Sequence, residues 1–270
     1  MAFAAKEAAH ELSGSQIAVV RFAVMLLPIL LWPRWWRAAV TWTRKDLLLY
    51  RGVFGGVAVL LYFLTIEKIP VGIATLLNYT SPLWSVAFAA LFLAERVRWA
   101  LVPPALAAFS GVVLVVLGRP ADAPTLVGNP WVLVGAISAV LSGAAVTAIR
   151  AARRTEGSWA IFASFSLFGL LAALPLAWST WRTPSAEGWF WLIVVGFTSV
   201  GAQLSMTHAY KWATNLEAGA LAQLAVVITL VLGAWLLDEP LTPLAVVGAF
   251  LAVGGVLAVV WLQRTPRAVE

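Results

Sequence analysis

Residues 90–116, ALFLAERVRWALVPPALAAFSGVVLVV, align without a gap on residues 234–260, AWLLDEPLTPLAVVGAFLAVGGVLAVV. The offset of 144 residues places Glu95 on Glu239, and an offset one residue shorter relates segments further upstream. Duplicated hydrophobic halves are typical of membrane transporters, in which two repeats move around a binding site that lies between them. The repeat therefore indicates a transport function before any single side chain is considered.

The composition excludes an ordinary soluble domain. The chain of 270 residues is 62% hydrophobic and 11% charged, and its mean hydropathy is +0.91, whereas about a quarter of the residues in soluble domains are charged. With no cysteine and two histidines, the sequence predicts no disulfide, no metal site and no cofactor. The net charge of +6 does not indicate a nucleic-acid partner, because membrane proteins gather positive charge in their cytoplasmic loops.

The hydrophobic runs predict an all-α integral membrane protein. A helix needs about 20 apolar residues to cross the bilayer, and nine segments reach that length. They are 15–33, 46–65, 70–93, 98–117, 130–149, 158–179, 187–207, 214–237 and 241–262. A shorter segment, residues 1–12, aligns with the second half of 130–149. We therefore expect a ten-helix bundle in the natural protein, with the first helix incomplete in this chain.

The repeat also predicts the organisation of the chain. The first repeat is residues 1–118, a linker follows at 119–129, the second repeat is 130–263, and a cytoplasmic tail is 264–270. Thirteen lysines and arginines, Arg51 among them, fall in loops on one side of the membrane, against four on the other. This bias places both termini in the cytoplasm, with the protein in the inner membrane. Since five helices form each repeat, the second repeat is inverted relative to the first.

The last helix of each repeat, 98–117 and 241–262, has almost no polar residue in its middle. Small residues recur there at four-residue spacing, as in Gly248 and Ala252, and such spacing lets helix backbones approach closely in lipid. We expect these two helices to lie outside the transport pathway, where they can form a homodimer.

The segment 70–93 carries the richest polar stripe. Its members share one helix face and are Thr75, Asn78, Ser81, Pro82 and Ser85. Pro82 has no N–H and disrupts the bond to the carbonyl of Asn78, which predicts a hinge or a substrate site near the middle of the membrane. The alternative is a kinked helix whose polar groups are satisfied by its neighbours.

Further substrate-binding candidates lie on other segments. Tyr79 and Tyr62 supply aromatic walls that suit organic metabolites, although ordinary packing also explains Tyr62. Gln203 lies deep in 187–207, and Gln223 aligns with Tyr79 across the repeats. His208 titrates near neutral pH and is a candidate for proton coupling, or it is a structural histidine at the cytoplasmic end.

Three charged residues have structural interpretations. Glu95 and Glu239 each lie between one helix and the next, where a carboxylate caps the amides of the following helix; a gating role is the alternative. Arg21 lies inside a predicted helix and must pair, reach an interface or line water. Glu7 and Glu11 are its candidate partners.

The chain resembles the drug/metabolite transporter superfamily, in particular its EamA-type branch. The resemblance rests on the run IATLLNYTSPLWSVAFAALFLAERVRW at 73–99, with its central Pro82 and closing Glu95, and on the second-helix-like stretch around Arg21. It implies two inverted five-helix repeats that move small metabolites, in many cases outward. One departure is Val226, which stands where the second repeat is expected to have a proline, so only one proline hinge remains.

These observations predict a secondary transporter, an exporter or exchanger that moves a small organic metabolite such as an amino acid by alternating access. The predicted partners are that metabolite and the lipid bilayer, and the mostly neutral polar groups favour a neutral or zwitterionic substrate. One alternative is a lipid-carrier flippase of the same fold. Another is an integral-membrane enzyme, but that requires clustered His, Asp or Glu at one membrane face, and the sequence offers no candidate catalytic residue.

Overall fold

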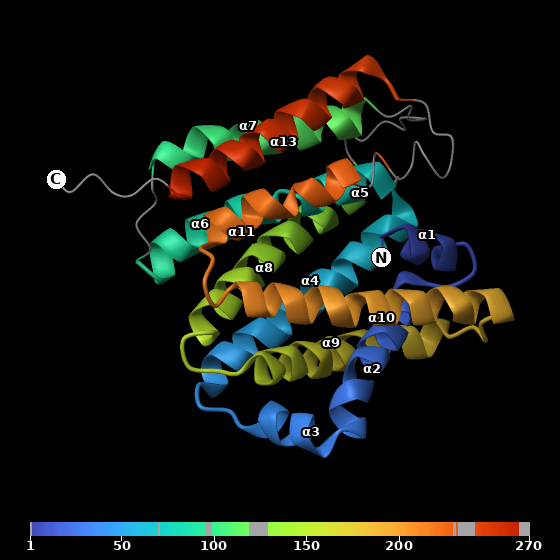
Figure 1. The fold of residues 1–270 in the computed structure, drawn as a ribbon. Helices are drawn as coiled ribbons and strands as arrows, with labels where there is room; N and C mark the ends of the chain where they lie inside the picture. Colours follow the sequence, from blue (N-terminus) through green and yellow to red (C-terminus); the bar gives the residue numbers. More distant parts are fainter. Residues whose placement is uncertain are drawn as a thin grey trace. The chain divides into compact units, whose positions relative to one another are not determined.

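A computed structural model describes residues 2–69, 71–94, 99–118, 129–228, 231 and 241–264. Every regular element within these ranges is a helix, as Figure 1 shows. The predicted capping acids Glu95 and Glu239 lie outside the described residues, as do most of the predicted linker and tail.

Six helices of the described chain are long and apolar enough to cross a membrane. They are α2 (Gly14–Leu31), α4 (Lys45–Lys68), α8 (Pro130–Ala152), α9 (Ser158–Thr180), α10 (Ala186–Ala209) and α13 (Pro243–Arg264). Six of the nine predicted segments match them to within a few residues, because long apolar runs leave the backbone no partner in lipid except its own helix. The predicted all-helical membrane fold is confirmed at this level.

The remaining elements are shorter. They are α1 (Ala2–Ala9), α3 (Pro33–Val40), α5 (Val71–Asn78), α6 (Ser81–Phe92), the 3₁₀ turn η1 (Trp99–Leu101), α7 (Val102–Leu117) and α11 (Asn215–Ala222). α7 begins four residues later than the predicted segment 98–117. Its first turn contains Pro103 and Pro104, and proline is tolerated in the first turn of a helix but not further inside.

The prediction of one continuous helix over 70–93 is wrong, because the structure divides this segment into α5 and α6. The Tyr79 N–H still donates to the Thr75 carbonyl at 2.9 Å, but the Thr80 N–H donates to the Leu77 carbonyl at 3.0 Å, which tightens the last turn. Pro82 has no N–H to offer the carbonyl of Asn78. The interruption therefore lies where the sequence predicts a hinge.

A similar interruption occurs after α11, at the position equivalent to Tyr79. Gln223 ends the helix, and its N–H donates to the carbonyl of Ala220 at 3.1 Å. Gln223 itself has φ −64° and ψ −24°, values close to those of a 3₁₀ turn, and helical geometry resumes over 224–228. Since Val226 replaces the proline here, the second interruption was not expected from the sequence.

Residues 1–88 and 129–213 form one compact unit. Within it α4 packs against α8 and α9, and α2 packs against α9 and α10. Glycines allow the close approach of α4 and α9, since a Cβ on Gly56 would lie 2.5 Å from Cα of Gly169. The core of this unit includes the fully buried rings of Phe22, Phe63 and Phe165.

Residues 89–128 and 214–270 form a second compact unit. In its described part α7 and α13 lie side by side (Figure 1). A Cβ on Gly248 would lie 2.6 Å from the Gly111 carbonyl oxygen, and a Cβ on Gly255 would lie 2.5 Å from the Ala108 nitrogen. Gly248 thus belongs to a packing surface, as its spacing predicts. Both compact units contain parts of both sequence repeats, and the repeat boundaries stay a prediction.

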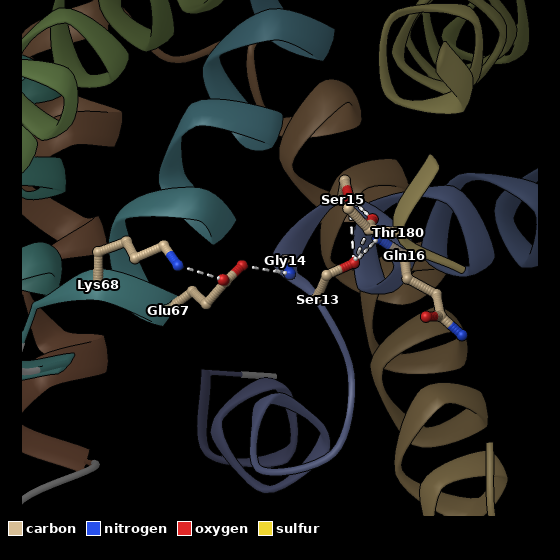
Figure 2. A network of polar contacts seen from close by, with 7 residues as sticks. All are labelled: Ser13, Gly14, Ser15, Gln16, Glu67, Lys68 and Thr180. Atoms are coloured by element: carbon tan, nitrogen blue, oxygen red, sulfur yellow. Dashed lines mark hydrogen bonds and ion pairs between the residues drawn. The ribbon is translucent and has the colours of Figure 1, made fainter. Parts of the chain in front are cut away.

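A polar network ties three helix ends together in the first unit (Figure 2). The Gly14 N–H at the start of α2 donates to the Glu67 carboxylate at 2.9 Å, and Glu67 pairs with Lys68 at 2.8 Å. The Ser13 hydroxyl lies 3.1 Å from the Thr180 hydroxyl at the end of α9. These contacts fix where α2 begins relative to the ends of α4 and α9.

Glu11 caps the start of α10 through Ser185. Its carboxylate accepts hydrogen bonds from the Ser185 N–H at 2.6 Å and from the Ser185 hydroxyl at 2.8 Å. We expect Glu11→Ala to lower the free energy of unfolding by about 1 kcal/mol, the usual value of a helix cap. Chemical unfolding in detergent measures this, with Glu7→Ala as the control. An equal loss in both variants would contradict the capping role.

Candidate functional site

The polar stripe of α5 and α6 is partly engaged in helix contacts. The hydroxyls of Tyr62 and Thr75 lie 3.3 Å apart and join α4 to α5, while the Ser85 hydroxyl donates to the Pro82 carbonyl at 2.9 Å. Asn78, Tyr79 and Ser81 are partly buried. The side chains of Asn78 and Ser81 form no hydrogen bond to another described residue, so their polar groups stay available as the predicted recognition groups.

The other predicted substrate-binding residues do not gather around that stripe in the described contacts. His208 is exposed in the last turn of α10 and packs edge-to-face on Trp212, with ring centroids 4.7 Å apart. Gln223 is buried in the second compact unit, so its predicted proximity to Tyr79 stays a prediction. Gln203, in contrast, is partly buried and is part of a polar cluster that contains two buried arginines.

That cluster contains Arg51, which the sequence predicts to be one of the loop charges. This prediction is wrong: Arg51 lies in the second turn of α4 and is 3% exposed. Its Nη2 donates to the Gln203 side-chain oxygen on α10 at 2.9 Å. The nearby Arg44 behaves as a loop charge should. It is half exposed and pairs with Asp46 at 2.7 Å, and this hydrogen bond raises the pKa of Arg44.

Arg21 lies in the same cluster, and the predicted pairing with Glu7 or Glu11 is wrong. Its Nε donates instead to the Ser199 hydroxyl on α10 at 2.7 Å. Glu11 is committed to Ser185 at the start of α10, and no described carboxylate forms an ion pair with Arg21. The arginine is 2% exposed, so it does not reach an interface either.

Aromatic rings bring the two arginines together. The Phe165 ring centroid lies 3.9 Å from Cζ of Arg51 and 5.6 Å from Cζ of Arg21. The two guanidinium carbons are therefore separated by no more than the sum of these distances. The rings of Phe22 and Phe63 lie 5.2 Å and 5.8 Å from Cζ of Arg21, which gives Arg21 three aromatic neighbours.

Arg21 and Arg51 are two buried positive charges that no described carboxylate balances. Each guanidinium has five N–H donors and a permanent charge. Burial costs several kcal/mol per ion, while a desolvated cation–π contact contributes about 2 kcal/mol. Nη1 of Arg21 and Nε of Arg51 are buried and have no hydrogen-bond partner among the described residues. The two charges also repel each other, so the cluster has donors and charge in excess.

Gly55 makes room for the Arg51 side chain. A Cβ at Gly55 would collide with Nη1 of Arg51 and would lie 3.0 Å from a ring carbon of Phe165. The spacing of Arg51 and Gly55 is the signal by which the sequence could have revealed that Arg51 is buried. An arginine one turn before a glycine, inside an otherwise apolar run, has space to fold back along its own helix.

The chain is similar to several known proteins. Residues 1–117 and 129–261 match the EamA-like transporter family. The pseudopaline exporter CntI of Pseudomonas aeruginosa strain UCBPP-PA14 is 31% identical over 207 residues, 76% of this chain and 72% of that protein. The probable terminal-alkyne amino-acid exporter of Streptantibioticus cattleyicolor is 31% identical over 202 residues, 71% of this chain and 64% of that protein.

A solved protein crystal structure has the same fold. It aligns with a TM-score of 0.79 at 23% identity, and the alignment covers 96% of this chain and 91% of that one. At this identity the likeness concerns the fold alone.

Proposed function

The chain belongs to the EamA-like transporter family, and from this membership we propose that it exports a small organic metabolite, an amino acid or a related compound, across the cytoplasmic membrane. Membership confirms the resemblance predicted from the sequence and makes the chain a multi-pass membrane transporter. The names of two relatives, an exporter of pseudopaline and a probable exporter of an amino acid, support the outward direction and the substrate class.

One structural observation carries the proposal furthest. A polar cluster of the buried Arg21 and Arg51 and the partly buried Gln203 lies inside a bundle of apolar helices. Ionisable groups at such positions are costly and mark substrate or ion pathways in membrane proteins. A packing role alone does not require two arginines.

The proposed mechanism is alternating access by two inverted five-helix repeats in the inner membrane, with both termini in the cytoplasm. The interruptions at Pro82 and Gln223 act as hinges in equivalent helices of the two repeats. The proposed recognition groups are Asn78, Tyr79, Ser81, Tyr62, Gln203, Gln223 and His208. α7 and α13 lie outside the pathway and are available for a homodimer.

Export is tested with purified protein in liposomes loaded with radiolabelled amino acids of neutral, basic and acidic types, together with thermal stabilisation by the same compounds. A ligand that binds the folded state raises its stability by mass action. We expect Asn78→Ala to raise the KM of the transported compound about tenfold, the effect of losing roughly 1.4 kcal/mol of binding energy. Thr198→Ala is the matched control, since the exposed Thr198 hydroxyl bonds only within its own helix.

If Asn78→Ala transports the compound with the wild-type KM, Asn78 does not bind the substrate. If no soluble compound moves or stabilises the protein while a lipid-linked compound does, the exporter proposal is wrong and the flippase alternative holds.

A further inference from the structure

We propose that Arg21 and Arg51 form an anion subsite that binds carboxylates of the exported metabolite, and that this metabolite has more carboxylates than ammonium groups. The inference rests on the proposed function and names the chemical class of its substrate. It replaces the sequence-based preference for a neutral or zwitterionic compound.

The first argument is charge balance. Two permanent positive charges lie buried on α2 and α4, and neither forms an ion pair with a described carboxylate. A neutral ligand leaves both charges unmatched, and a zwitterion adds one negative and one positive charge, so the net positive charge of the two arginines stays unchanged. Only a ligand with excess negative charge brings the site close to neutrality, which a buried site of low dielectric requires.

The second argument is the supply of hydrogen-bond donors. Arg21 is held by one bond from Nε to Ser199, and Arg51 by one bond from Nη2 to Gln203. These bonds orient the planar groups and leave buried donors at Nη1 of Arg21 and Nε of Arg51. Guanidinium groups match the planar, two-oxygen geometry of a carboxylate. A ligand with two carboxylates therefore satisfies both arginines at once.

The third argument concerns the elements that hold the subsite. Ser199 and Gln203, which accept the two arginine bonds, are on α10, four residues apart and therefore on the same helix face. Phe165 of α9 contacts both guanidinium groups. The four helices α2, α4, α9 and α10 belong to one compact unit. A bound dianion would link α2 to α4 through the two arginines, so that binding is coupled to the packing of these helices.

The test is thermal stabilisation of the full chain in detergent by matched probes. Glutarate and glutamate carry two carboxylates, whereas glutamine replaces one carboxylate by a neutral amide of the same shape. We expect glutarate to stabilise the wild type most, glutamate less and glutamine least. Arg21→Gln and Arg51→Gln should each weaken the apparent affinity for glutarate by at least a factor of about 10. Arg44→Gln, which removes an exposed arginine paired with Asp46, should bind as the wild type does.

Gly55→Ala is a second variant that keeps both arginines. The added Cβ displaces the end of the Arg51 side chain, and we expect weaker glutarate binding in a folded protein. Gly55→Ala moves the Arg51 guanidinium and keeps its charge, whereas Arg51→Gln removes the charge, so the two variants separate the effect of position from the effect of charge.

The outcomes separate this inference from the proposed function. If glutamine stabilises the protein as well as glutarate does, or if Arg51→Gln leaves glutarate binding unchanged, the anion subsite is wrong while the exporter proposal stands. If inorganic phosphate stabilises the protein and no carboxylate does, the arginines bind a different oxyanion and the carboxylate assignment is wrong. If glutarate binds through both arginines but no metabolite is exported, the subsite stands and the proposed function fails.

Discussion

Replacing Arg51 with methionine is expected to stabilise the unliganded protein while removing glutarate binding. The change deletes a buried charge that has no acid partner and repels Arg21. Methionine is flexible, has a similar reach and packs well against an aromatic ring such as Phe165. Replacement of a buried ion pair by apolar residues of similar volume often stabilises by about 1–4 kcal/mol, and we expect a gain here too because no described acid offsets the burial of Arg51. The Gln203 oxygen loses a donor, but Gln203 is only partly buried and can bond to water.

The measurement is chemical unfolding in detergent without ligand, compared with binding of glutarate to the same samples. Arg44→Met is the control, because Arg44 is half exposed and its loss should leave the free energy of unfolding nearly unchanged. Marked destabilisation by Arg51→Met would mean that Arg51 is a structural connection between α4 and α10. Stabilisation with loss of binding would mean that the charge is retained for function at a cost in stability.

Replacing Gly111 with valine is expected to prevent the normal packing of α7 against α13. A Cβ at Gly111 would lie 2.5 Å from the carbonyl oxygen of Gly248 and would collide with the backbone nitrogen of Ala252. These are backbone atoms of the opposite helix, so no side-chain rotation relieves the overlap and the helices must separate. Overpacking costs about 1–3 kcal/mol in ordinary cores and occasionally more, and we expect a loss at the upper end or beyond.

Gly254→Val supplies the matched control. Gly254 is on the partner helix of this pair, α13, and no atom of another described element lies within 4 Å of the place that a Cβ would take there. The yield of folded protein and the melting temperature should fall sharply for Gly111→Val and little for Gly254→Val. Equal behaviour of the two variants would contradict the packing of α7 on α13 through its glycines.

Some features of the site follow from short stretches of sequence. The hinge position is one, because the missing N–H of Pro82 acts on the carbonyl of Asn78 four residues earlier. The glycine-mediated packing of α7 on α13 is another, because the spacing of small residues along each helix is enough to predict the close approach of the two backbones. The interruption at Gln223 has no such local cause, since Val226 is compatible with a helix interior.

The arginine cluster shows why the rest could not be predicted. A charge near the end of an apolar run is compatible with a loop, an interface or the interior, and it is the positive-charge bias of the loops that predicts a loop position for Arg51. Whether it is buried depends on Gln203 and Phe165, which are more than 100 residues away in the sequence. The partner of Arg21 is likewise decided by the approach of α10, which brings Ser199 and not an acid to it.

The sequence by itself determined that this protein is a helical membrane transporter, because hydrophobic length and an internal repeat act through local and periodic properties of the chain. Only the tertiary structure decided which polar groups lie together. Packing of α2, α4, α9 and α10 places Arg21 and Arg51 in one apolar site with no described acid beside them. The physical reason is that the cost of a buried charge depends on its neighbours in space, and the sequence order of a helical bundle does not fix those neighbours.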